Sequence, residues 1–332
     1  MISCLSRESH TTERVQSVSS VLSSSIVTRC GYHIYTVWLF TFSDLKTIVF
    51  PSTAFGIVNA LAIFIEESST NPEILAVHYR HLLSAIPSVI LWTWINLLPF
   101  AVNNQRQPDA IQEDLLNKPW RPVPSGRISP RPAKLLMLVT YLLAIITSKI
   151  LGNTLYCLML IALGFWYNNL RGADASCLVR NLINAFGFVC FASGAMQAAV
   201  GKNRPVFRLL GWWYCIIACI VFTTVQMQDM YDQRGDKVRN RKTVPLVLGD
   251  AFARWTIAVP MLIWCWLAPL LWKSSALGFV VPVTIGLIVA IRVLKNRTEA
   301  GDKRTFQLWN MWLVSVYVLP LVKAYGNVSH RT

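Results

Sequence analysis

Three aspartates lie three and four residues apart in the segment 228–237: Asp229, Asp232 and Asp236. A helix with this spacing would carry all three carboxylates on one face. Carboxylates so close raise each other's pKa unless a positive charge lies among them. Mg²⁺ binds through one or two carboxylates together with water and phosphate oxygens. Because a dense run of Lys and Arg follows, the segment predicts a site for a metal-bridged diphosphate.

A second acidic segment lies about 120 residues earlier and is also followed by basic residues. Its polar residues include Asn104, Glu113, Asp114, Lys118, Arg121 and Arg127. One such segment alone is more often a solvated charged loop than a binding site. Two in one apolar chain favour a shared anion site, since Lys and Arg make strong charge-assisted hydrogen bonds to phosphate.

The composition is that of an integral membrane protein. Of 332 residues, 54% are hydrophobic and only 14% are charged, whereas a soluble domain carries about 25% charged residues.

Nine apolar segments each approach the roughly 20 residues that a helix needs to cross the hydrocarbon. They are 48–65, 81–101, 133–151, 154–170, 181–200, 209–227, 252–272, 275–294 and 307–325. We therefore predict an all-α, polytopic membrane protein with a nine-helix transmembrane bundle, preceded by an interfacial helix near Trp38. Very short connections predict antiparallel hairpins within 133–170 and 252–294.

The positive charge indicates the orientation of the bundle. The chain has 31 Lys and Arg against 16 Asp and Glu, a formal charge of +15. The loops after the even-numbered spans hold sixteen of these basic residues, and the other loops hold six. Cytoplasmic loops of membrane proteins are enriched in Lys and Arg. The amino terminus and both acidic segments are therefore expected in the cytosol, with the endoplasmic reticulum as the expected membrane, and no nucleic-acid partner is needed to explain the charge.

The acidic residues avoid the predicted spans altogether. A proton-coupled transporter or ion pump would carry ionisable residues there, so the sequence disfavours a transporter or a receptor without catalysis. Residues 1–30 are rich in Ser and Thr and have no long apolar core, which predicts a disordered cytosolic tail. A mitochondrial presequence is the alternative for this segment. Residues 31–327 then form the transmembrane domain, and 328–332 a short tail.

The segment Asp229 to Lys237, with Lys242 downstream, resembles the second aspartate motif of the UbiA superfamily of intramembrane prenyltransferases. The segment from Asp114 to Arg127 is similar to the tail of the first motif of that family. The head of the first motif differs. Counting back four and eight residues from Asp114 gives Ala110 and Arg106 where the family has an acid and an amide.

The run Glu-Asp-x-x-Asn-Lys-Pro-Trp-Arg-Pro and the segment 32–50 resemble a fungal branch of this superfamily that contains membrane-bound terpene cyclases. The resemblance implies a class I type cyclase that ionises farnesyl diphosphate with Mg²⁺. The product would be a bergamotene-like sesquiterpene hydrocarbon of secondary metabolism. A UbiA-type transfer of the prenyl group to an aromatic or polyketide acceptor remains the alternative. The expected partners are a prenyl diphosphate and membrane lipid, with no obligate protein partner.

The resemblance also implies roles for individual residues. Catalysis is expected of Asp114, Asp229, Asp232 and Asp236, and metal binding of these four with Asn104 and Glu113. Substrate binding is expected of Asn104, Lys118, Arg121, Arg127, Tyr167, Asn168, Lys237 and Lys242. Tyr167 and Asn168 end the fourth predicted span on the cytosolic side, where they would meet the diphosphate, and Asn184 is a further polar candidate. Aromatic rings in the spans would stabilise a carbocation once water is excluded. The candidates are Trp92, Trp94, Phe165, Trp166, Tyr167, Phe186, Phe188, Phe191, Trp212, Trp213, Tyr214 and Phe222.

Overall fold

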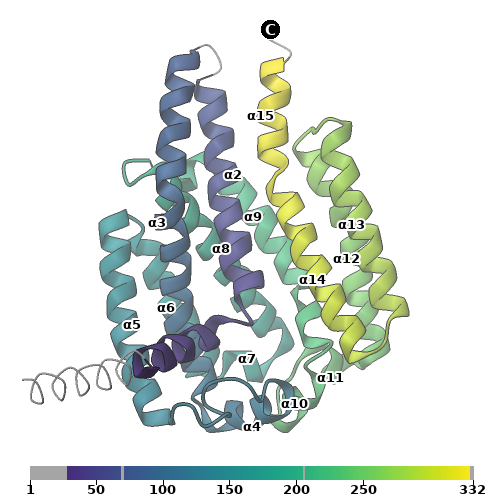
Figure 1. Ribbon diagram of the computed structural model, residues 1–332. Helices are drawn as coiled ribbons and strands as arrows, with labels where there is room; N and C mark the ends of the chain where they lie inside the picture. The colour runs from purple at the N-terminus through teal and green to yellow at the C-terminus, as the bar shows by residue number, and fades with distance from the viewer. Residues whose placement is uncertain (1–27, 69–70, 205, 330–332) are drawn as a thin grey trace, which may run out of the picture.

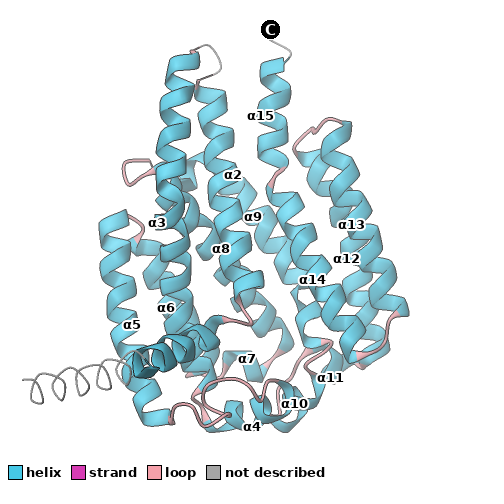
Figure 2. Cartoon of the chain, in the orientation of Figure 1, coloured by secondary structure: helices cyan, strands magenta, loops and turns pink. Residues whose placement is uncertain are grey.

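The computed structural model describes residues 28–68, 71–204 and 206–329, and in these residues every regular element is a helix (Figures 1 and 2). A first helix spans residues 28–41. The elements that follow are η1 (Leu45–Val49), α2 (Phe50–Glu67), α3 (Pro72–Gln105), α4 (Pro108–Asn117), α5 (Pro130–Leu151), α6 (Thr154–Asn168), α7 (Gly172–Ala175), α8 (Cys177–Val200), α9 (Val206–Thr224), η2 (Val225–Asp229), α10 (Gln233–Val238), α11 (Val244–Leu248), α12 (Asp250–Leu271), α13 (Ala276–Lys295), α14 (Glu299–Tyr317) and α15 (Leu319–Ser329).

The all-α membrane architecture is confirmed, but the count of nine spans is not. Eight helical stretches of the described chain are long and apolar enough to cross a membrane. The remaining apolar helix, α6, has 15 residues, fewer than the roughly 20 that a perpendicular span needs. The two predicted hairpins are present: α5 packs on α6 after a turn at Gly152, whose φ is +79°, and α12 packs on α13.

Helix α8 is the centre of the bundle, because its small residues let neighbours approach closely. In its apolar window 78% of the residues are buried, against 22% in α5. A Cβ on Gly194 would lie 1.9 Å from the ring of Trp92 in α3. Across the helix, a Cβ on Gly56 of α2 would lie 2.7 Å from the backbone of Ala195. Close contact through glycine is the usual way in which transmembrane helices pack.

The short helices α4, α7, α10 and α11 gather at one end of the bundle, at the bottom of Figure 1, while α15 ends at the opposite side. The helix 28–41 lies across the spans at that same lower end (Figure 1), as expected of an interfacial helix. The predicted tail 1–30 falls outside the described residues up to residue 27, and residues 28–30 are helical. Of the short tail 328–332, residues 330–332 lie outside the described chain.

Asp229, Asp232 and Asp236 would share one face only if their segment were a single helix, and the segment is not a single helix. Asp229 ends the 3₁₀-helix η2, Asp232 is the N-cap of α10, and Asp236 lies inside α10. The chain turns between them, so each carboxylate faces a different partner. The three partners are Arg180, Lys118 and Arg241.

Candidate active site

The two acidic segments meet where α4 packs against α10. The Asn117 side chain at the end of α4 donates from Nδ2 to the carbonyl of Asp232 at 3.0 Å and accepts from the Gly235 N–H at 3.2 Å. A Cβ on Gly235 would lie 2.3 Å from Nδ2 of Asn117, so a glycine is required there. One amide thus ties the first segment to the second, although they are more than a hundred residues apart in sequence.

Lys118 and Arg121 neutralise one acid from each segment. Lys118 Nζ lies 2.9 Å from Asp232 Oδ2. Arg121 donates to both oxygens of Asp114 at 2.8 and 3.0 Å, and to Ser43 Oγ. Burial lowers the pKa of Lys118, but the Asp232 carboxylate outweighs it and the pKa ends above its ordinary value. Burial raises the pKa of Asp114, and Arg121 offsets this only in part.

A second ion network lies behind these pairs. Arg241 donates to Glu113 at 2.8 Å and to Asp174 and Asp236 at 3.1 Å, and Arg239 donates to Glu113 at 3.1 Å. All five side chains are buried. Burial raises the pKa of Glu113, but the two guanidinium groups bring it below its ordinary value. Breaking such a buried pair from one side costs about 3–5 kcal/mol, so this network fixes the shape of the site.

Asp236 is the least neutralised acid of the site. Its Oδ1 accepts from Arg241, while its buried Oδ2 has no partner. Burial, with a contribution from Asp229, raises the pKa of Asp236 to about 7, although Arg180 and Arg241 oppose the shift. A buried carboxylate oxygen without a donor is costly unless a proton or a cation satisfies it.

A chain of hydrogen bonds joins this charged end to the interior of the bundle. Arg180, near the start of α8, donates to Asp229 at 2.8 and 3.1 Å and to the Tyr167 hydroxyl at 2.5 Å. Because that hydroxyl accepts from Arg180, its own proton is free to be donated to an anion. All three side chains are buried.

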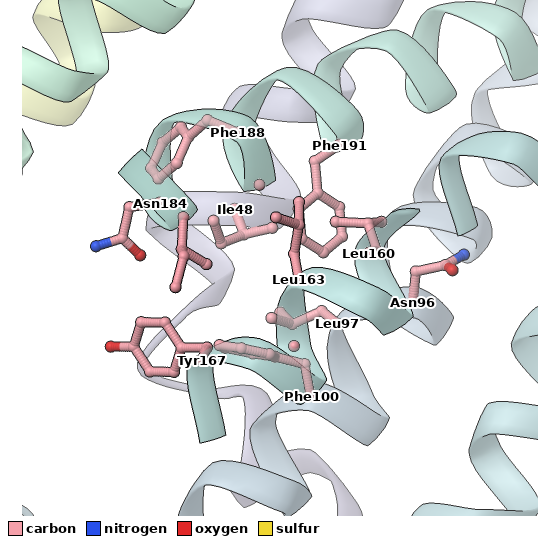
Figure 3. A pocket seen from close by; sticks show the side chains of 13 residues that line it. Ile48, Asn96, Leu97, Phe100, Leu160, Leu163, Tyr167, Asn184, Phe188 and Phe191 are labelled. Carbon is pink, nitrogen blue, oxygen red and sulfur yellow. The ribbon is translucent and has the colours of Figure 1, made fainter. Parts of the chain in front are cut away.

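Tyr167 is also part of the wall of an apolar cavity between α3, α6 and α8, closed by Ile48 of η1 (Figure 3). The empty space among these side chains, counted together with the open space at its mouth, amounts to about 490 Å³. Its wall is made by Ile48, Asn96, Leu97, Phe100, Leu160, Leu163, Gly164, Tyr167, Ile183, Asn184, Gly187, Phe188 and Phe191. In Figure 3 the Tyr167 hydroxyl and Asn184 lie at one side of the cavity, and Asn96 lies at the other. The cavity is therefore mainly apolar and aromatic. We call the side of Tyr167, which adjoins Arg180, its polar end, and the Asn96 amide lies at the opposite side.

Buried polar atoms without a protein partner occur throughout the described chain. Among the residues proposed for the site they include Oδ1 of Asn104, both side-chain polar atoms of Asn168, Nδ2 of Asn184 and Oδ2 of Asp236. Buried polar atoms are nearly always hydrogen-bonded, so Asp236 Oδ2, which lies inside the charged cluster, is an atom that a bound cation or a proton would satisfy. A carboxylate oxygen is a hard donor of the kind that Mg²⁺ prefers.

In the described part of the chain, no three acidic, His or Cys side chains are grouped closely enough to hold a metal by themselves. Mg²⁺ sites commonly use one or two carboxylates and take the other ligands from water and substrate phosphates. Asp236 Oδ2, a carboxylate oxygen of the charged cluster without a partner, fits one ligand of such a shared site.

The structure separates the basic residues expected to bind substrate into three groups. Lys118 and Arg121 lie within the charged cluster. Lys237 and Lys242 are exposed outside it. Arg127 lies over the rings of Tyr32 and Tyr35, 4.1 and 4.9 Å from their centroids, and thus fastens the helix 28–41 to the loop after α4.

Sequence reasoning missed Arg180, Asp174, Arg239 and Arg241 as parts of the site. Arg180 was counted only as a loop charge, although its position at the start of an apolar span, next to Asn181, could have marked it. Arg239 and Arg241 belong to the same basic run as Lys237 and Lys242, and only the fold reveals which members turn inward. Of the aromatic candidates, Tyr167, Phe188 and Phe191 line the cavity, and Phe100 was not among those candidates.

Comparison with known proteins gives one consistent result. The sequence profile described as the UbiA prenyltransferase family matches residues 105–314. The fumagillin beta-trans-bergamotene synthase of Aspergillus fumigatus is 31% identical over 86% of this chain and 91% of its own. The somaliensene A/B synthase of Streptomyces somaliensis is 27% identical over 84% of this chain and 89% of its own. A UbiA homolog from Archaeoglobus fulgidus, solved bound to GPP and Mg²⁺, superposes with a TM-score of 0.50 over 83% of this chain and 98% of that protein, at 13% identity.

Proposed function

This chain belongs to the UbiA prenyltransferase family, and we propose that it is a membrane-bound terpene cyclase that ionises farnesyl diphosphate with Mg²⁺. The product would be a bergamotene-like sesquiterpene hydrocarbon of secondary metabolism. The observation that carries the proposal is the Tyr167–Arg180–Asp229 connection, through which an aromatic cavity adjoins a charged cluster. The two relatives described above are both named as terpene synthases and match over most of their length.

The charge balance of the cluster explains why a metal would be needed. Its six acids are Glu113, Asp114, Asp174, Asp229, Asp232 and Asp236, and its five bases are Lys118, Arg121, Arg180, Arg239 and Arg241. There is no surplus of positive charge to attract a diphosphate. Bound Mg²⁺, held by Asp229, Asp232 and Asp236 of one segment and Asp114, Asn104 or Glu113 of the other, would supply that charge and stabilise the leaving group.

The protein's own side chains would bind the diphosphate and enclose the prenyl chain. Lys118, Arg121 and Arg180 would neutralise oxygens of the diphosphate as the allylic C–O bond breaks, and Tyr167 would donate its free proton to one of them. The prenyl chain would lie in the cavity, where water is excluded. There the faces of Phe100, Phe188 and Phe191 would stabilise the carbocation.

Basic loops favour an orientation in which this end of the bundle faces the cytosol, where soluble prenyl diphosphates would reach it. We propose the endoplasmic reticulum as the membrane.

One assay separates cyclisation from prenyl transfer. Microsomes from yeast that express the chain are given farnesyl diphosphate and Mg²⁺ without an acceptor, and the organic extract is analysed. A cyclic hydrocarbon, absent from control microsomes, is the expected result. Turnover that begins only when an aromatic or polyketide acceptor is added would instead establish the prenyltransferase that the family name implies.

A further inference from the structure

The glycines of α8 do not all serve helix packing. Gly194 is required because a Cβ would enter the ring of Trp92 at 1.9 Å. At Gly187, in the same helix, a Cβ would meet no atom within 4 Å. Glycine is also a poor helix former compared with alanine. Neither packing nor helix propensity therefore accounts for glycine at position 187.

The open space above Gly187 belongs to the cavity. Residues 183, 184, 187, 188 and 191 of α8 all line it, which is the spacing of a single helix face. Across the cavity, Gly164 of α6 is already packed, because a Cβ there would meet the Phe100 ring at 3.1 Å. Because Gly187 has no side chain, the space beside it is part of the cavity and is not filled by a neighbouring helix.

The position of Gly187 along α8 indicates which part of a bound prenyl chain would lie beside it. Seven residues separate it from Arg180, which corresponds to about 10 Å along the helix axis. Arg180 binds Asp229 and Tyr167 at the polar end. A side chain at position 187 would therefore lie beyond the reacting end of a bound prenyl chain and beside its middle.

From this geometry we propose that Gly187 is a specificity-determining residue that sets the length of prenyl chain the cavity admits. The inference rests on the proposed function, since it takes the cavity as the prenyl site. In a variant with a larger residue at position 187, the new side chain fills the space needed by the distal isoprene units and leaves the space for the proximal ones. Shorter prenyl diphosphates are then preferred over longer ones.

The test compares Gly187→Ala and Gly187→Leu with the full-length wild-type protein. Gly326→Ala in α15 is the matched control, because a Cβ there also meets nothing within 4 Å and the site lies at the far end of the bundle. Binding is measured as the Mg²⁺-dependent rise in Tm with farnesyl and with geranyl thiodiphosphate, which resist ionisation. Turnover of the natural diphosphates is measured separately.

We expect Gly187→Leu to lower the affinity for the farnesyl analogue relative to the geranyl analogue by roughly tenfold or more, the order of discrimination that a filled apolar pocket provides. Gly187→Ala should move the ratio in the same direction with an unchanged or higher ligand-free Tm, and Gly326→Ala should leave the ratio unchanged.

Three outcomes would overturn the inference: a ratio within twofold of wild type in a folded Gly187→Leu protein, a ligand-free Tm that falls in Gly187→Ala, and no stabilisation of the wild type by either analogue. If the ratio shifts as expected but the wild type turns over no prenyl diphosphate, the inference stands and the proposed function fails.

Discussion

Asp229 and Asp232 are three residues apart, yet their substitution should have different consequences. Asp229 is paired with Arg180, and both side chains are almost fully buried. Asp232 is paired with Lys118, and the side chains are 17% and 18% exposed. A buried guanidinium that loses its counter-charge is strongly destabilising, whereas a partly solvated ammonium is not. Substitution of the two aspartates therefore allows a loss of catalytic activity to be distinguished from a loss of stability.

We predict that Asp232→Asn lowers turnover by at least about a hundredfold with little change in Tm, because it removes a ligand of the diphosphate-bound metal. Asp229→Asn should lower the free energy of unfolding by about 3–5 kcal/mol as well. Both quantities are measured on protein purified in detergent, with Glu73→Gln, an exposed acid in the first turn of α3, as the control. Full turnover by a folded Asp232→Asn protein would contradict the metal assignment.

Tyr167→Phe tests the connection between the cluster and the cavity. The ring remains in the wall, 5.4 Å from the Phe100 ring, but one N–H of Arg180 loses its acceptor, which costs about 1–3 kcal/mol when the donor stays buried. We predict a lower Tm and a reduced kcat. Tyr79→Phe, whose hydroxyl contacts Tyr325 at the other end of the bundle, should leave kcat unchanged, and an unchanged kcat in Tyr167→Phe would contradict the proposed role.

The protonation of Asp236 predicts a pH dependence of stability. Its pKa of about 7 in the folded protein is above the ordinary 3.8. The folded state therefore holds this proton more tightly than the unfolded state does. The stabilisation from this group is complete below about pH 4 and is lost as the pH rises through about 7. In metal-free protein, Tm should fall from about pH 5 to pH 8, and Asp236→Asn should flatten this fall. An equal slope in both proteins would show that another group is responsible.

At the scale of the elements, the sequence predicted the apolar helices and the acidic motifs, because hydropathy and family spacing are local properties. It did not predict that the chain breaks between η2 and α10, so that three closely spaced aspartates face three different cations. Nor did it separate the buried Arg239 and Arg241 from the exposed lysines of the same run. Those features depend on the packing of α4 against α10, which no local pattern encodes.

The crossing of α3 and α8 can be tested at Gly194. An added methyl group would meet the Trp92 ring, which Ser148 of α5 holds through a hydrogen bond of 2.8 Å. We predict that Gly194→Ala lowers the free energy of unfolding by about 1–3 kcal/mol through overpacking. Gly326→Ala is the control and should be neutral or slightly stabilising. A Gly194→Ala protein as stable as wild type would show that α3 can move away without cost.

At the scale of the whole molecule, the bundle gathers charge at one end and keeps an aromatic cavity in its interior, with Tyr167 and Arg180 between them. Class I type cyclisation needs both parts, since the diphosphate must be neutralised while its hydrocarbon is kept from water. The two acidic segments lie at the same end of the bundle, where the proposed diphosphate would reach both.

The most direct test of this arrangement is a structure of the protein with Mg²⁺ and farnesyl thiodiphosphate. We predict that the diphosphate lies between α4 and α10, in contact with Lys118 and joined to Asp232 through Mg²⁺, while the farnesyl chain fills the cavity beside Tyr167 and Gly187. A diphosphate that contacts only one acidic segment, or a chain that lies outside the cavity on the lipid-facing surface, would contradict the account.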